Sequence, residues 1–313
     1  VIRRVEHLTP ASMKQLQKLS VVQTPISREL IRHICKARDE EIYDLLNEAK
    51  YNEILLKQGN HYHFTFAEAK TYLHDRCQPK TRNLVSKRVL EFYDNQNVTD
   101  PQTCMGIIGN ARTAGDRASE RRYLLRLHLL LSEDHLQQEA YDALAHALRI
   151  DFSGDIDLRQ EEIVEDLVKF RRMVEITGCT TEAEFIYARQ SDIPECFEKY
   201  LLLGTLFLFQ GDRKSALKNF EKAEKLSADA SQKSTAKLYQ AQIYARTEPA
   251  RVKKCLDGIA LEKVSQAFQI KAATLMAAYE SRDRDYDRAA RGLEDFLTEL
   301  APLANWMPSS QVP

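Results

Sequence analysis

The residues from 197 to 230 constrain the fold of this chain more than any other stretch of it. Large and small side chains recur there at the three- and four-residue spacing of a helix face, and a glycine interrupts the pattern. The residues that make the pattern are Tyr200, Leu203, Gly204, Phe207, Gly211, Ala216, Phe220 and Ala223. Gly204 and Ala216 are small enough for two helix backbones to approach closely. The stretch therefore predicts an antiparallel pair of helices joined by a turn at Gly211.

This spacing resembles the tetratricopeptide repeat, in which pairs of helices stack into a superhelix. The alternative is an ordinary antiparallel helix pair. In the repeat family the first helix of each pair lines the concave side, and the resemblance implies that a protein or a small effector binds there. The matching positions are Glu198, Leu201, Thr205, Leu208 and Phe209. Since Leu208 and Phe209 are apolar, they predict either an apolar groove for a partner or packing against a neighbouring repeat.

Helices are also expected on both sides of this pair, with breaks at Gly115, Gly154 and Gly178. The predicted helices are 101–113, 117–131, 134–149, 158–177, 181–190, 194–209, 213–227, 231–246, 249–257, 262–280 and 284–300. Weaker repeat signatures lie at Leu238, Ala241 and Tyr244, and at Tyr286, Ala289 and Leu293. We therefore predict a tetratricopeptide-like α-solenoid over residues 96–304 and a tail over 305–313.

The first 95 residues have a different pattern. Helix starts are expected at Thr9-Pro10, at Ser27 and at Asp39, which we interpret as the cap of a third short helix. Two short runs, 53–57 and 61–66, flank Gly59-Asn60, and the second alternates aromatic with polar residues, which indicates a β-hairpin. Three helices followed by a hairpin are typical of a winged helix, so residues 1–95 are predicted to form a winged-helix-like domain in a mostly α-helical protein.

Composition limits the classes of function. The chain of 313 residues has a net charge of −1, which argues against a protein built mainly to bind nucleic-acid phosphates. Its six cysteines are widely spaced, which predicts reduced thiols in a cytoplasmic protein rather than disulfides or a metal site. Since no long apolar run occurs, we expect no membrane span.

Taken in order, these elements resemble the signal-transduction ATPases with numerous domains, the STAND class, and within it the maltose-activator-like (LuxR-type) regulators. The resemblance is carried by 16–22, 26–30, 45–56 and 62–64. It implies that a winged helix links a nucleotide-binding module to a helical sensor. No G-x-x-x-x-G-K-[ST] motif occurs in this sequence, so the ATPase would precede Val1 and any effector domain would follow Pro313 or lie upstream.

The proposed third helix carries five acidic residues, Asp39, Glu40, Glu41, Asp44 and Glu48. Carboxylates in the position of a DNA-reading helix repel phosphates, so direct DNA binding is the weakest of three functional hypotheses. The first is a non-catalytic sensor region of a STAND-type regulator, and the second is a free-standing tetratricopeptide adaptor. We expect no catalytic residues, no cofactor and no metal; His61 and His63 share a hairpin face, which we interpret as solvated.

Overall fold

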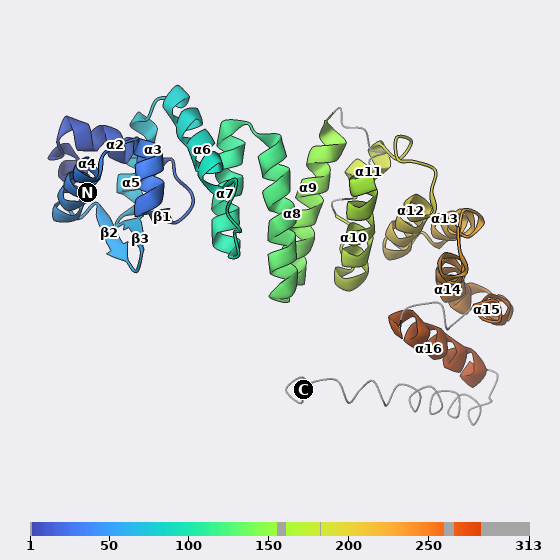
Figure 1. Ribbon diagram of the computed structural model, residues 1–313. Coiled ribbons are helices and arrows are strands. Elements are labelled where there is room, and N and C mark those ends of the chain that lie inside the picture. Colours follow the sequence, from blue (N-terminus) through green and yellow to red (C-terminus); the bar gives the residue numbers. More distant parts are fainter. Residues whose placement is uncertain (1, 155–160, 182, 260–265, 283–313) are drawn as a thin grey trace. The chain divides into compact units, whose positions relative to one another are not determined.

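The computed structural model describes residues 2–154, 161–181, 183–259 and 266–282 (Figure 1). The chain divides into two compact units, Val1–Ile156 and Asp157–Pro313. Each unit consists mainly of helices that pack on their neighbours in sequence order. This is the mostly α-helical architecture that the sequence predicts. The domain boundary that the sequence predicts at residue 95 is of another kind, because it separates the part that contains strands from the part that contains helices alone. It stays a prediction.

The first unit begins with a winged-helix-like fold. Its elements are α1 (Ile2–Glu6), α2 (Pro10–Ser20), β1 (Ile26–Ser27), α3 (Arg28–Cys35), α4 (Asp39–Tyr51), β2 (Leu55–Gln58) and β3 (His61–Phe64). The strands form an antiparallel sheet in the order β1-β3-β2, with Ile26 opposite Tyr62 and Leu55 opposite Phe64. Gly59, at a φ of 59°, makes the hairpin turn.

Local caps explain where these helices begin. Thr9 Oγ1 accepts a hydrogen bond from Ser12 N at 3.3 Å, and Ser27 Oγ accepts one from Leu30 N at 3.1 Å, as the sequence predicts. The prediction that Asp39 caps α4 is wrong by one residue. Asp39 is the first helical residue, and the side chain of Glu41 accepts the hydrogen bond from Arg38 N at 2.8 Å. An acidic residue suits either position because the helix N-terminus is positive.

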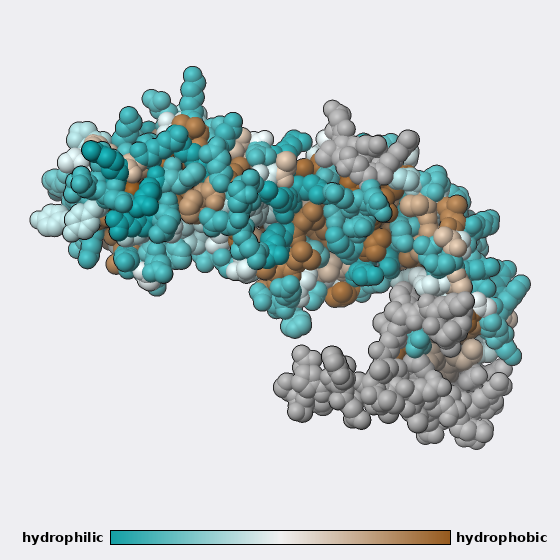
Figure 2. All heavy atoms as spheres, in the orientation of Figure 1, coloured by the Kyte–Doolittle hydropathy of each residue, from teal (hydrophilic) through white to brown (hydrophobic). Residues whose placement is uncertain are grey.

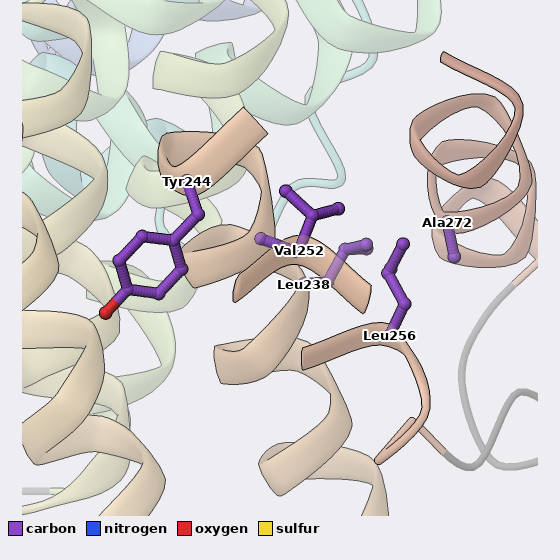
Figure 3. Close-up of a cluster of buried hydrophobic side chains, with 6 residues drawn as sticks. Leu238, Tyr244, Val252, Leu256 and Ala272 are labelled. Carbon is purple, nitrogen blue, oxygen red and sulfur yellow. The ribbon is translucent and has the colours of Figure 1, made fainter. Parts of the chain in front are cut away.

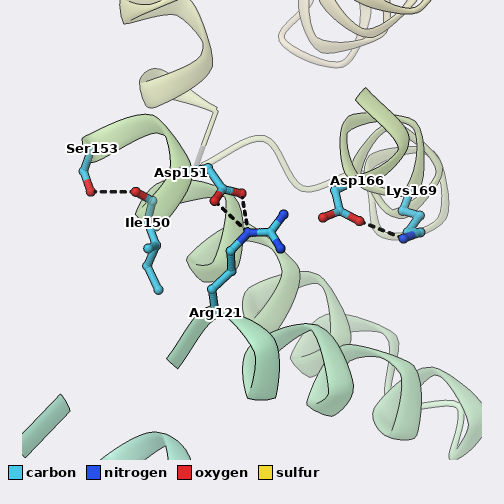
Figure 4. A network of polar contacts seen from close by, with 6 residues as sticks. All are labelled: Arg121, Ile150, Asp151, Ser153, Asp166 and Lys169. Atoms are coloured by element: carbon cyan, nitrogen blue, oxygen red, sulfur yellow. Dashed lines mark hydrogen bonds and ion pairs between the residues drawn. The ribbon is translucent and has the colours of Figure 1, made fainter. Parts of the chain in front are cut away.

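Five helices continue the first unit. They are α5 (Ala67–Arg76), α6 (Pro79–Tyr93), α7 (Pro101–Ala114), α8 (Arg117–Glu133) and α9 (Gln137–Ser153). Figure 1 shows α7, α8 and α9 side by side, and α7 packs on α8 as α8 does on α9. Gly115 turns the chain between α7 and α8 at a φ of 69°. Arg121 Nε donates to the buried carboxylate of Asp151 at 2.6 and 2.8 Å, which ties α8 to α9 (Figure 4).

The second unit contains α10 (Glu161–Thr177), α11 (Glu184–Ala188), α12 (Phe197–Phe209), α13 (Arg213–Lys225), α14 (Ala230–Thr247), α15 (Pro249–Leu256) and α16 (Gln266–Arg282). A hydrophobic cluster joins the last three helices (Figure 3): Leu238, Ala241, Tyr244, Val252, Leu256 and Ala272. The predicted helix 181–190 is much shorter than expected, since α11 has only five residues. The predicted helix 284–300, with Tyr286, Ala289 and Leu293, and the tail 305–313 lie outside the described residues.

No helix in the described ranges is long and apolar enough to cross a bilayer. On the face seen in Figure 2, the region of the winged helix is mostly hydrophilic. Two strand residues that the sequence assigns to a solvated face, His61 and His63, are exposed. Within the part of the chain that the structure describes, His, Cys, Asp and Glu side chains nowhere gather in the threes that a metal ion needs.

Candidate ligand-binding surfaces

The pair α12–α13 has the geometry that its sequence predicts. A Cβ atom at Gly204 would lie 2.5 Å from Cε1 of Phe220, so the glycine lets the aromatic ring pack against the α12 backbone. Ala216, Phe220 and Ala223 are fully buried on α13. Gly211 makes the turn at a φ of 86°, and Asp212 caps α13 by accepting a hydrogen bond from Ser215 N at 3.0 Å.

Only part of the predicted concave surface is accessible. Leu201 and Thr205 are 1% and 0% exposed, so neither side chain lines an accessible groove. Leu201 and Thr205 lie three and seven residues after Glu198, so all three share one side of α12. The helix α12 packs against α10. Leu208 is half-buried and Phe209 is 43% exposed, so these two residues remain candidates for partner contact.

Glu198 lies near two arginines of α10, Arg171 and Arg172. Burial raises the pKa of its carboxyl group above the usual range, although the guanidinium groups of Arg171 and Arg172 oppose that shift. Arg171 is itself buried; its Nη1 donates to Tyr239 Oη at 3.1 Å and pairs with Glu175. Tyr239 also donates to Glu175, so one polar network connects α10 to α14. Lys271 on α16 lies 4.7 Å from the centre of the Tyr239 ring.

A polar cavity of about 370 Å³ lies beside the same helix pair. The lysines Lys199, Lys218 and Lys222 line it, together with the carboxylate of Glu195 and the ring of Tyr200. These residues are not predicted from the sequence, because lysines on a helix are ordinarily solvated. The signal that separates Lys199 from an ordinary surface lysine is its place in the repeat, one residue before Tyr200 and hence close to the helix crossing.

In the winged helix, α4 is the element that would read DNA in a DNA-binding domain of this fold. Asp39, Glu40, Glu41 and Asp44 are all exposed on α4. Tyr43 and Tyr51 are exposed as well, at 62% and 88%. The helix thus presents carboxylates and phenol rings to solvent. The carboxylates are negative, so they would repel a phosphate backbone.

The fifth acidic residue of α4, Glu48, turns away from this surface. Its Oε1 accepts a hydrogen bond from Thr9 N at 2.6 Å, and its Oε2 accepts one from Thr9 Oγ1 at 2.9 Å and another from Ser12 Oγ. Burial raises the pKa of Glu48, but these hydrogen bonds outweigh it, so the net shift is downward. Glu48 therefore has a structural role at the start of α2.

In the first unit, a buried polar junction connects the winged helix to α7, α8 and α9, which we call the helix array. Asn110 on α7 is 0% exposed, and its Nδ2 donates to Val21 O at 3.1 Å and to Ser86 Oγ at 3.2 Å. Its Oδ1 accepts from Gln23 N at 3.1 Å. A Cβ atom at Gly106 would lie 2.6 Å from Gln23 O, so the segment after α2 lies directly across α7. One side chain thus fixes the winged helix to the first helix of the array.

Comparison with known proteins gives a likeness to a solved structure but no match in sequence. No protein-family model matches the chain, and no curated protein matches it. The fold is similar to the crystal structure of a signal transduction ATPase with numerous domains (STAND) protein with a tetratricopeptide repeat sensor from Pyrococcus horikoshii. Sequence identity is 13% and the TM-score is 0.42, over 96% of this chain and 52% of that chain. The chain therefore spans about half the length of that protein.

Proposed function

We propose that this chain is a non-catalytic sensor or protein-interaction region of a STAND-type signalling or transcriptional regulator. In this proposal, the helical pairs bind an effector or a protein partner, and the winged helix transmits the bound state to an upstream nucleotide-binding module. The proposal gives the chain no cofactor and no catalytic step of its own. A free-standing adaptor is the second candidate, because helix pairs of this kind also hold proteins together without any switch.

The observation that carries the proposal is the junction at Asn110. A winged helix on a flexible linker would move independently of the array, whereas this one shares a fully buried amide with α7. Tyr123 on α8 adds a second connection, because its hydroxyl donates to Tyr93 O on α6 at 2.9 Å. Coupling between two sites requires a physical connection whose states both sites can bias. The junction is suited to that role.

The acidic α4 supports transmission rather than DNA reading. Arg32 pairs with Asp39, and Arg38 lies 3.4 Å from Glu41, so the nearest arginines are already partnered by carboxylates of the same surface. A weaker alternative is still a DNA-binding regulator. Unchanged mobility of duplex DNA at low salt, with the chain in excess, is the expected result. Saturable retardation would support the alternative.

The test of the binding function is a melting-temperature screen of the chain against small molecules and fractionated cell protein. A ligand that binds only the folded state raises the melting temperature by mass action. The proposal expects stabilisation that persists in Tyr43→Ala, on α4, and is lost in Phe209→Ala, on α12. Both residues are exposed, which makes them a matched pair. Loss in the α4 variant alone would assign binding to the winged helix and contradict the proposal.

The gene separates the two leading candidates. A phosphate-binding loop encoded upstream of Val1 supports the regulator, because that loop would supply the nucleotide site that the resemblance implies. If the full reading frame encodes no such loop, the adaptor becomes the better account of the same helix pairs.

A further inference from the structure

A short helix precedes the clearest repeat. In a stacked array, each repeat packs against its neighbours. The helix directly before α12–α13 is α11, which has five residues. It reaches only the end of α12, where Tyr187 packs 5.2 Å from Phe207 between ring centres and donates to Gln210 Oε1 at 3.0 Å. The cavity of about 370 Å³ lies alongside, between α12, α13 and the segment after α11.

The cavity is lined by more positive than negative charge. Lys199, Lys218 and Lys222 face a single carboxylate, that of Glu195. Lys199 has a side chain that is only 4% exposed, and its Nζ donates to Ile193 O at 3.0 Å as well as to Glu195. Lys222 Nζ lies 4.6 Å from the centre of the Tyr200 ring and 3.4 Å from its hydroxyl. With three ammonium groups and one carboxylate, the lining residues carry an excess of two positive charges.

We propose that this cavity binds a small molecule through its phosphate group. A phosphate monoester carries about −1.5 to −2 charges near pH 7, which matches the two excess positive charges. Ammonium groups bind phosphate as point charges and do not require the fixed geometry of arginine. The volume is near the lower end of small-molecule sites, which suits a sugar phosphate or a ligand of similar size. Leu203 and Phe207 supply an apolar wall for its body.

Glu195 shows how an anion is held there. Its carboxylate accepts hydrogen bonds from Lys199 Nζ and from the Tyr200 hydroxyl, and both oxygens are used. Those hydrogen bonds, with the nearby lysines, lower the pKa of Glu195. The side chain is nevertheless 66% exposed, so it can turn to solvent without leaving a buried charge. A phosphate would take over the same donors and add Lys218 and Lys222, with Glu195 as its competitor.

The effector role of the bound ligand rests on the proposed function, but the binding of phosphate does not. Binding itself is tested directly by isothermal titration calorimetry on the full chain at low ionic strength. The probes are inorganic phosphate, glucose 6-phosphate, glucose and acetate. Saturable binding of one phosphate probe per chain is expected, with no heat from glucose and much weaker binding of acetate. Equal binding of acetate and the phosphate probes would overturn the assignment to phosphate.

Three variants locate the site. Lys222→Gln removes an exposed charge that lines the cavity and should weaken phosphate binding about tenfold, the effect of one charge-assisted hydrogen bond. Lys225→Gln removes an exposed charge from the same helix outside the cavity and should change it little. Glu195→Gln removes the competing carboxylate and should strengthen binding several-fold. Circular dichroism confirms that each variant is folded.

Two further results would overturn the inference. One is the absence of phosphate binding both in the parent chain and in Glu195→Gln, and the other is equal loss in Lys222→Gln and Lys225→Gln. Either result leaves the proposed function standing if another ligand still stabilises the chain through Phe209. Phosphate binding without any stabilising partner at Phe209 would instead support this site alone.

Discussion

Gly204 of α12 lies against the ring of Phe220 on α13, so closely that a single added carbon atom would come within 2.5 Å of the ring. The two residues are sixteen positions apart in the sequence and belong to the same helix pair. Because Phe220 is fully buried, its ring cannot move aside without displacing other core side chains. This contact holds the two helices at close range.

Replacing Gly204 with leucine should destabilise the second unit by about 3 kcal/mol or prevent its folding, because overpacking forces a backbone shift. Urea unfolding followed by circular dichroism measures the effect. Lys214→Leu adds the same side chain to an exposed position of α13 and should change the free energy of unfolding by less than about 0.5 kcal/mol. Equal unfolding midpoints for Gly204→Leu and the parent would show that the assigned helix crossing is wrong.

Asn110→Ala should destabilise the first unit by about 3 kcal/mol, because it leaves the Val21 carbonyl, the buried Ser86 hydroxyl and the Gln23 N–H without their partner. Asn95→Ala, an exposed asparagine in the connection after α6, is the matched control and should be close to neutral. Thermal and urea unfolding both report the difference. A loss below about 1 kcal/mol for Asn110→Ala would mean that water replaces the amide without cost.

Glu48 should give the first unit a pH-dependent contribution to stability. Its folded pKa is lowered, because hydrogen bonds from Ser12 and Thr9 outweigh the effect of burial. The contribution is therefore present above the ordinary glutamate pKa of about 4.3 and disappears as pH falls through the lower folded value. Glu48→Gln should cost about 1 kcal/mol at pH 7 and little at pH values below that range.

Unfolding of the parent and Glu48→Gln across this pH series tests the sign. Glu40→Gln, on the exposed face of the same helix, controls for the general loss of negative charge. A difference between the parent and Glu48→Gln that grows as the pH falls would contradict the assignment.

The six cysteines should differ strongly in reactivity. Burial raises the pKa of the Cys35 and Cys104 thiols to about 11, so almost no thiolate is present at pH 7.5. Cys179 and Cys196 are only partly buried. Iodoacetamide labelling read by peptide mass spectrometry should modify Cys179 and Cys196 first, with equal labelling of all six in denaturing urea. Early labelling of Cys104 would show that α7 opens far more often than its packing implies.

Elements with local signals are predictable from the sequence. Three helices begin where a side-chain oxygen accepts a hydrogen bond from the backbone N–H three residues later, at Thr9, Ser27 and Asp100. These helix starts therefore depend on neighbours along the chain. Gly59 and Gly211 are placed at turns for the same reason, since both have positive φ. The contact of Gly204 with Phe220 is predictable because the repeat pattern fixes both positions.

Features that depend on distant residues are not predictable in this way. The strand β1 has two residues and no periodicity, and it exists because Ile26 pairs with Tyr62. The burial of Leu201 and Thr205 depends on α10, which ends at Thr177, well before α12 begins at Phe197. The cavity depends on where α11 stops, and nothing in 189–196 marks that point strongly. The junction at Asn110 also joins segments almost ninety residues apart.

The junction at Asn110 should make the winged helix and the first helices of the array open as one cooperative unit. Native-state hydrogen exchange in low concentrations of urea tests this cooperativity, because it measures the opening free energy of each amide. Buried amides of α3, such as Ile31 and Ile34, should open together with those of α7, such as Ile107, at one shared free energy. Opening of the α3 amides at a free energy about 2 kcal/mol or more below that of Ile107 would show instead that the winged helix opens separately from α7.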